Sequence, residues 1–408
     1  MKLFLSTMVL FIASHTVAQQ LEWTALANPD SLQVNAVRFS NDNAKVVSAT
    51  NCHPAHIRLY HTANGIQTWD YEVPNNLMCQ MGIGFSSDGK YLASIEEMGN
   101  VIIFDYSVPI PDSINTISMG TMYAFSIDFA PNAQKFAAGG SNGKLQTYQV
   151  NSGTIDLDIN AHSSWVTAVC YAPNNQWLAS GGNDNKIKIW DTLGNLLFSL
   201  NGHTDDITSL KFSPDNTRLF SSSLDNTVKV WNTTNGTLIQ TVAVSNADVN
   251  AMDLTSNGLV MATVSKDNLI RLFTTSTFTP IDSFLQHHNG IPICLGFSSD
   301  GSKLVTGTSN GLVTLYNVAS LTNVDTYQKL DFNDVTIYPN PIGNDIYISS
   351  KASMQWYKIS DVLGEVLFSG NIINNRIPVD KNLKSGTYVL TLNNHANQQI
   401  SRIILKNK

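Results

Sequence analysis

The sequence predicts an all-β protein, and three observations support this. A segment that ends in an apolar residue and a Ser-x-Asp-type turn occurs seven times, at steps of 41 to 46 residues. Each copy contains short runs of alternating apolar and polar residues. Turns rich in Asn, Asp and Gly separate these runs. Because a period of about 40–45 residues with several short strands is typical of a propeller blade, we expect a seven-bladed β-propeller.

The copies can be aligned on two apolar positions. The first strand of each copy ends at Phe39, Phe85, Phe129, Tyr171, Phe212, Leu254 and Phe297. A turn, a second strand and a tight Asx or Gly turn follow, and a further strand ends at Tyr60, Phe104, Tyr148, Trp190, Trp231, Phe273 and Tyr316. Strands joined in this way predict one antiparallel sheet per copy. Seven such sheets bury both faces when they stack around an axis.

The ring also needs a closing strand. Residues 21–26 alternate between apolar and polar residues and precede the first copy, where an outer strand is expected.

The fourth and fifth copies repeat one polar pattern with the same spacing. The pattern comprises His162, Ser180, Asp184 and Trp190, and then His203, Ser221, Asp225 and Trp231. These residues resemble the WD-repeat family of seven-bladed propellers, over about residues 20–325. The resemblance implies a buried, hydrogen-bonded His-Ser-Asp-Trp tetrad in each of these blades. It also implies that the strand at 21–26 completes the last blade, so that Trp23 packs on the blade carrying Tyr316.

The tetrad pattern weakens in the other copies. The seventh has His288, Thr306, Asn310 and Tyr316, and the sixth keeps Thr263 and Asp267 but lacks the His. The first three copies have lost most of it.

The tetrad residues also raise the question of catalysis, because a His between a Ser and a carboxylate can activate a nucleophile. However, the same residue types recur at the same offsets in the next blade. A catalytic triad is needed once, whereas a structural network is needed in every blade. We therefore expect no catalytic residues, no cofactor and no enzymatic activity.

Composition narrows the possible partners. Only 13% of the residues are charged and the formal net charge is −7, without a Lys- or Arg-rich block. Nucleic acid is therefore an unexpected partner. Lys2, an apolar run over residues 3–13 and short residues near Ala18 have the layout of a secretory signal, expected at residues 1–18. No later segment has the roughly 20 apolar residues of a membrane-spanning helix.

The period stops near residue 321. We expect the propeller at residues 19–325, a linker at 326–335 and a β-sandwich at 336–408, with short strand-like runs. The sandwich resembles the type A C-terminal sorting domain of the type IX secretion system. Tyr338, Pro339, Asn340 and Pro341 form its sorting motif, and the Asp361-x-x-Gly364 turn and a basic C-terminus also match. The resemblance implies contact with the type IX machinery and an extracellular or cell-surface location on a Gram-negative bacterium. The alternative is an ordinary β-sandwich that binds a ligand.

The four cysteines are too few for a disulfide scaffold. Cys52 and Cys79 fall on loops expected at the same face of the propeller, so we predict that they form a disulfide. Cys170 and Cys294 fall on different inner strands and are predicted to be buried thiols. The cluster of Cys52, His53 and His56, with His61 nearby, could alternatively hold a metal, but its spacing matches no established site. We expect an exposed loop and no metal.

The remaining candidate site is one rim of the ring. The residue six positions before the end of each first strand is expected there, which gives Gln33, Cys79, Tyr123, Trp165, Asp206, Asp248 and Ile291. Trp and Tyr commonly anchor interfaces. Tyr123 and Trp165 are thus candidate anchors, and Asp206 and Asp248 would orient the partner. Leu224, beside the tight turn of the fifth copy, could extend this patch as a further anchor. Alternatively, Trp165 only packs over its neighbour.

These features predict an exported, non-enzymatic platform that binds a protein on one propeller face, with a glycan as another possible ligand. The alternatives are a secreted propeller hydrolase or lyase acting on glycans or peptides, and an accessory part of the secretion or motility apparatus.

Overall fold

A computed structural model describes most of the propeller and parts of the C-terminal domain. The described residues are 20–27, 33–51, 55–73, 80–121, 123–285, 290–322, 336–338, 345–349, 354–360, 366–372, 376–379, 383–394 and 399–406. Contacts divide the chain into two compact units, Met1–Thr322 and Asn323–Lys408. The predicted signal at residues 1–18 lies outside the described residues.

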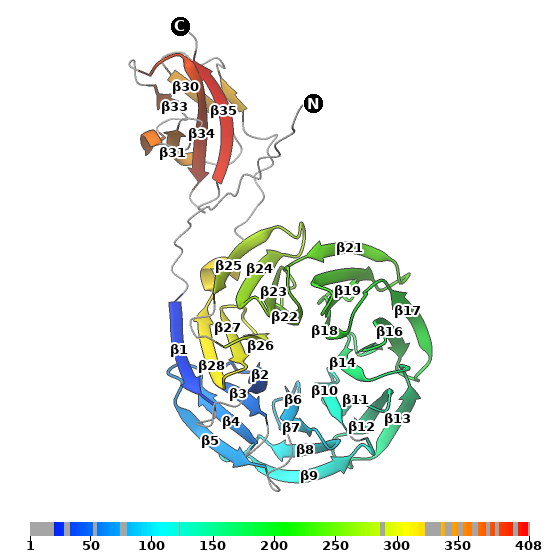
Figure 1. Ribbon diagram of the computed structural model, residues 1–408. Coiled ribbons are helices and arrows are strands. Elements are labelled where there is room, and N and C mark those ends of the chain that lie inside the picture. The colour runs from blue at the N-terminus through cyan, green and yellow to red at the C-terminus, as the bar shows by residue number, and fades with distance from the viewer. Residues whose placement is uncertain are drawn as a thin grey trace, which may run out of the picture. The chain divides into compact units, whose positions relative to one another are not determined.

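The first unit is a ring of seven four-stranded antiparallel sheets (Figure 1). The predicted seven-bladed propeller is confirmed. From the axis outward, blade one contains β2 (Val34–Phe39), β3 (Lys45–Thr50), β4 (His56–His61) and β5 (Gln67–Glu72). Blade two contains β6 (Gln80–Phe85), β7 (Tyr91–Glu96), β8 (Asn100–Asp105) and β9 (Asp112–Ser118). Blade three contains β10 (Ala124–Phe129), β11 (Lys135–Gly140), β12 (Lys144–Gln149) and β13 (Ile155–Asn160).

Blades four to six repeat the arrangement. Blade four contains β14 (Val166–Tyr171), β15 (Trp177–Gly182), β16 (Lys186–Asp191) and β17 (Leu196–Asn201). Blade five contains β18 (Ile207–Phe212), β19 (Arg218–Ser223), β20 (Thr227–Asn232) and β21 (Leu238–Ala243). Blade six contains β22 (Val249–Leu254), β23 (Val260–Ser265), β24 (Leu269–Thr274) and β25 (Pro280–Leu285).

Blade seven combines two distant parts of the chain. It contains β26 (Pro292–Phe297), β27 (Lys303–Thr308) and β28 (Leu312–Asn317), and its outer strand is β1 (Gln20–Leu26). The two strands pair antiparallel, with Leu21 opposite Tyr316 and Trp23 opposite Leu315. A short helix, α1 (Ala319–Thr322), follows. The predicted closure of the ring by residues 21–26 is confirmed.

Local sequence explains the hairpins. The predicted tight turns place Asn185, Asn226 and Asn268 at φ values of 62°, 69° and 65°. Asn tolerates this left-handed conformation because its short side chain can hydrogen-bond to nearby backbone. The two middle strands of each blade are almost wholly buried, so their small polar residues are buried together with the apolar ones.

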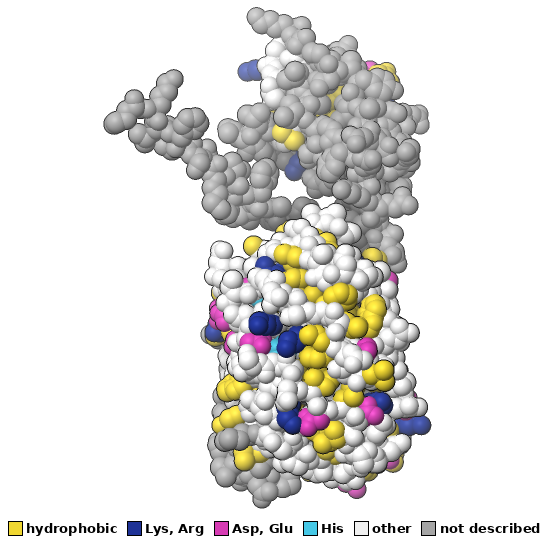
Figure 2. All heavy atoms as spheres, turned by 90° about the vertical axis from the view of Figure 1, so that its right-hand side faces the viewer, with side chains coloured by type: hydrophobic (Ala, Val, Ile, Leu, Met, Phe, Trp, Pro, Cys, Tyr) yellow, Lys and Arg dark blue, Asp and Glu magenta, His cyan; other side chains and the backbone are white. Residues whose placement is uncertain are grey.

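The outer strands have a different surface. Figure 2 faces the outer edge of the ring near β17 and shows hydrophobic side chains gathered among polar ones. Leu193, Leu196, Leu197, Leu238 and Ile239 are exposed there.

The C-terminal unit is a β-sandwich. One sheet contains β29 (Thr336–Tyr338), β30 (Asp345–Ser349) and β33 (Arg376–Pro378), and the other contains β31 (Met354–Ser360), β32 (Val366–Asn371), β34 (Gly386–Asn394) and β35 (Gln399–Lys406). Both sheets contribute to one core, in which Ile346, Ile359 and Leu390 are fully buried. The predicted small β-sandwich is confirmed.

Candidate functional site

The two tetrads are assembled on blades four and five. In blade four, Nδ1 of His162 lies 2.8 Å from Oδ1 of Asp184, and Nε2 lies 2.8 Å from Oγ of Ser180. Trp190 Nε1 donates to the same Oγ at 3.0 Å. An ionised carboxylate can only accept, so Nδ1–H of His162 donates to Asp184. In the neutral imidazole Nε2 is then the acceptor, so the Ser180 hydroxyl donates its proton to Nε2 and accepts from the indole. Each of the four side chains of this tetrad therefore has a hydrogen-bond partner.

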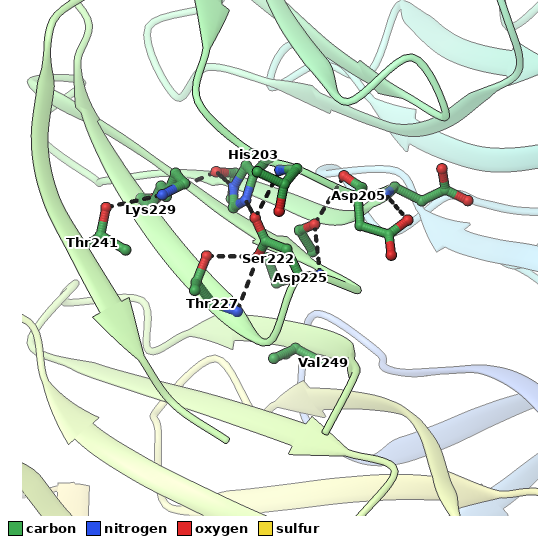
Figure 3. A network of polar contacts seen from close by, with 12 residues as sticks. His203, Asp205, Ser222, Asp225, Thr227, Lys229, Thr241 and Val249 are labelled. Atoms are coloured by element: carbon green, nitrogen blue, oxygen red, sulfur yellow. Dashed lines mark hydrogen bonds and ion pairs between the residues drawn. The ribbon is translucent and has the colours of Figure 1, made fainter. Parts of the chain in front are cut away.

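Blade five repeats this geometry. Nδ1 of His203 lies 2.7 Å from Oδ2 of Asp225, Nε2 lies 2.8 Å from Oγ of Ser221, and Trp231 donates to that Oγ at 2.9 Å. Figure 3 shows the network continuing from His203 through Asp225 to Thr227. Ser180 and Ser221 are fully buried. A substrate therefore has no access to either hydroxyl.

The electrostatics of the tetrads reflect their burial. Burial lowers the pKa of His162, although the hydrogen bond to Asp184 opposes this effect. For both aspartates burial is the largest single effect and acts to raise the pKa. The hydrogen bond and the charge of the histidine, together with hydrogen bonds from neighbouring residues, outweigh it in sum, so the pKa values of Asp184 and Asp225 lie below the usual range. These shifts correspond to a neutral imidazole beside an ionised carboxylate.

The weaker copies are only partly comparable. In blade six Ser245 takes the place of the His and donates to Asp267 at 2.8 Å. Thr263 is buried at the position of the Ser, but among the described residues its hydroxyl has no hydrogen-bond partner. In blade seven His288 lies outside the described residues. Thr306 and Tyr316 are buried there, and Asn310 accepts a hydrogen bond from Thr308.

The predicted rim residues occupy equivalent places in the blades that the structure describes. The backbone carbonyls of Gln33, Tyr123, Trp165, Asp206, Asp248 and Ile291 each accept a hydrogen bond from the residue that follows the second strand of the blade. In blade five that residue is Leu224, which brings it next to Asp206. Cys79 lies outside the described residues.

Three aromatic rings gather at this rim where blades three and four meet. The Trp165 ring stacks on Phe125 with centroids 5.0 Å apart, and it lies 6.0 Å from the Tyr123 ring. Trp165 nevertheless remains 41% exposed. Trp165 thus packs over the neighbouring blade and still presents a large apolar surface to solvent. We call Tyr123, Phe125 and Trp165 the aromatic rim.

Sequence reasoning missed Phe125. It follows Tyr123 by two residues, and on a strand this spacing places both side chains on the same face.

The acidic side of the rim is only partly neutralised. Asp248 pairs with Lys266 at 2.6 Å. Burial and the neighbouring Asp205 raise the pKa of Asp206. A cationic group on a partner would relieve this repulsion.

Other predicted residues are placed as follows. Cys52, His53, Pro339, Asn340 and Pro341 lie outside the described residues, so the predicted disulfide and most of the sorting motif stay predictions. Tyr338 ends β29. His56 Nδ1 lies 2.6 Å from an oxygen of Asp70, and His61 lies beside Lys45. Cys170 and Cys294 are buried free thiols. In the described ranges no group of three His, Cys, Asp or Glu side chains is arranged to hold a metal.

Charged side chains also meet at the axis of the ring, which sequence reasoning did not foresee. Arg38, Asp128, Lys211 and Asp253 line one cavity of about 200 Å³ together with Cys170. Each directly precedes the last residue of its inner strand. Lys211 and Asp253 form an ion pair of 3.1 Å between blades five and six. The sequence did contain a signal for this cluster. Side chains alternate between the two faces of a strand, so each charged residue points away from the face of the buried residue that follows it.

Comparison with known proteins adds the family. Residues 123–355, more than half of the chain, match the family described as the IFT122 first beta-propeller. The chain belongs to this family. It is a WD-repeat β-propeller, in agreement with the tetrads of blades four and five. Residues 336–406 match the secretion system C-terminal sorting domain, which marks this WD-repeat propeller for export.

One curated relative is a target of rapamycin complex subunit, LST8, from Saccharomyces cerevisiae. The two are 28% identical over 108 residues, which is 26% of this chain and 35% of the relative. The propeller thus spans about a third of the length of that relative. Among the residues described here, no helix is long and apolar enough to cross a membrane.

Proposed function

We propose that this exported WD-repeat propeller is a non-enzymatic platform that binds a protein partner through its aromatic rim. The observation that carries the proposal is the 41% exposure of Trp165 despite its stacking on Phe125. Stacking holds the indole in one orientation, so little conformational entropy remains to be lost on binding. Rigid exposed Trp and Tyr side chains are typical centres of protein interfaces.

The neighbouring charges favour a partner with a basic residue. Asp205 and Asp206 are adjacent carboxylates at the rim, and burial already disfavours the charged form of Asp206. A Lys or Arg of the partner would stabilise that carboxylate, and the association rate would then fall as salt increases. The name of the LST8 relative, a complex subunit, also supports a role in assembly.

In this proposal the tetrads are structural and not catalytic, because their serines are fully buried and the same arrangement occurs in two blades. The location also belongs to the proposal: the sorting domain delivers the propeller through the type IX machinery to the cell surface or the medium.

Cross-linking mass spectrometry tests the proposal in the outer-membrane and secreted fractions of the native host. Wild type is compared with Trp165→Ala, and Leu193→Ala is the matched control, because Leu193 is 77% exposed on the same blade but away from the rim. We expect one protein that cross-links to wild type and to the control but not to Trp165→Ala. Binding of the purified pair should weaken in Asp206→Asn.

A partner captured equally by Trp165→Ala would overturn the rim as the binding face. Without any protein partner, glycan binding and hydrolysis would be tested next with the purified propeller. Recovery of the mature propeller in the medium without its tail would argue against a part of the secretion apparatus.

A further inference from the structure

Two charged groups of the central cavity, Arg38 and Asp128, lie near opposite charges but form no direct ion pair among the described residues. Burial raises the pKa of the Asp128 carboxyl, while the charges of Lys211 and Arg38 act to lower it. Lys211 pairs with Asp253. In the part of the chain that the structure describes, neither Arg38 nor Asp128 forms an ion pair. A single guanidinium nitrogen of Arg38 donates to the carbonyls of Val37 and Leu295, at 3.0 and 3.2 Å. Asp128 Oδ2 accepts a hydrogen bond from the Tyr171 amide at 2.8 Å. Both side chains are thereby held in place.

Glycine leaves room beside these two groups. Arg38 lies on blade one and Asp128 on blade three, and the equivalent residue of the blade between them is Gly84. A Cβ atom at Gly84 would meet only the Phe129 ring, at 3.5 Å. The equivalent residue of blade seven is Gly296, whose Cβ atom would lie 3.8 Å from Arg38 Nη1. No side chain therefore projects from these two positions of the ring.

The space suits a small molecule. The cavity of about 200 Å³ would hold roughly six or seven waters at about 30 Å³ each. It adjoins a cavity of about 140 Å³ on the side of Phe125 and one of about 360 Å³ on the side of Pro173 and Pro214. These cavities share lining residues, so they lie next to one another along the inner strands.

The charges select the ligand. The four charged groups sum to zero, so a lone anion meets two carboxylates and a lone cation meets two basic groups. A molecule with both charges can pair its carboxylate with the guanidinium, which binds such groups through two parallel hydrogen bonds. Its ammonium group can pair with the carboxylate across the opening. We propose that the central channel binds a small zwitterion of the α-amino acid type, with its carboxylate at Arg38 and its ammonium at Asp128.

Isothermal titration calorimetry on the full chain tests this with three probes of similar size. L-alanine carries both charges, L-lactate lacks the ammonium and ethylamine lacks the carboxylate. We expect L-alanine to bind with a dissociation constant of about 1 mM or lower, and each other probe to bind at least about tenfold more weakly.

Variants locate the site. Asp128→Asn keeps an oxygen for the Tyr171 amide but removes the charge, and Arg38→Gln removes the guanidinium. We expect each to weaken L-alanine binding at least about tenfold. Lys144→Gln is the control, because it removes an exposed ion pair with Asp158 on the outside of blade three.

Three results would overturn the proposal: no heat from L-alanine, equal binding of L-alanine and L-lactate, or unchanged binding in Asp128→Asn. Circular dichroism checks that each variant is folded. If Arg38→Gln fails to fold, Asp128→Asn still decides the outcome. Loss of partner binding in Trp165→Ala has no bearing on this test, because the aromatic rim does not include the charged residues.

Discussion

The indole nitrogen of Trp23 donates a 2.8 Å hydrogen bond to the carbonyl oxygen of Thr62. Trp23 belongs to the outer strand of blade seven, whereas Thr62 follows the third strand of blade one. The same indole ring packs 6.0 Å from the ring of Tyr60 and against the backbone of Gly65, where a Cβ atom would lie 2.7 Å from it. One side chain therefore fastens the closing strand to the next blade.

Trp23→Ala is expected to lower the free energy of unfolding by about 3–5 kcal/mol, because it removes a buried aromatic ring and leaves a cavity. Leu21→Ala in the same strand is the control, since Leu21 is 39% exposed. Urea unfolding measures both. Equal losses in the two variants would show that Trp23 has no special part in closure.

Deletion of residues 19–28 should make blade seven sensitive to protease, because β28 then has an unpaired edge. Limited proteolysis followed by mass spectrometry would locate the first cuts within residues 290–322. A truncated protein as resistant as the full chain would rule out closure by β1.

His203→Ala should destabilise the propeller by about 1–3 kcal/mol, because Ser221 and Asp225 lose a buried partner. His61→Ala, at an exposed position beside Lys45, should have almost no effect. Thermal melting distinguishes the two. An unchanged melting temperature in His203→Ala would mean that the network contributes nothing to stability.

Stability should fall in two pH windows. The pKa of His162 is depressed, so its contribution is complete above about pH 6.5 and is lost as pH falls toward the lower folded value, since the unfolded chain binds the proton first. The pKa values of Asp184 and Asp225 are also depressed, so their contribution is lost only below the usual value of 3.8.

Urea unfolding of wild type and His162→Gln between about pH 5 and 8 tests the first window. Wild type should lose up to about 1.4 kcal/mol for each pH unit within the window, and the variant should lose less. Parallel curves would contradict the assignment to His162.

Alkylation of the native protein should spare two cysteines. Burial raises the pKa of Cys294 to about 12 and the pKa of Cys170 well above its usual value, so little thiolate is present at neutral pH. Peptide mapping after iodoacetamide treatment, with and without reduction, measures all four cysteines. Cys52 labelled without reduction would reject its predicted disulfide with Cys79.

The sequence was most informative where the same chemistry repeats. His162 and His203 could be assigned to tetrads because each residue type recurs at a fixed offset. The strand of Trp23 could be placed on blade seven because the ring needs a closing strand, but the contacts of the indole with Tyr60 and Thr62 of blade one were not predicted. The common location of Arg38 and Asp128 in the central cavity could not be predicted in this way. They stand on different blades, differ in residue type and meet only because the ring brings the inner strands to one axis. The stacking of Trp165 on Phe125 likewise depends on the angle between two blades.

The shared seventh blade has a consequence for the order of folding. Six blades take all their strands from one continuous stretch, so each can pair its strands as soon as that stretch of the chain is available. Blade seven must wait, because β1 emerges first and β28 emerges near the end of the propeller. Closure is therefore a late, long-range step, of the kind that slows folding. A chain interrupted before Leu312 would leave Trp23 without its pairing strand, so the ring can close only when the whole propeller sequence is present.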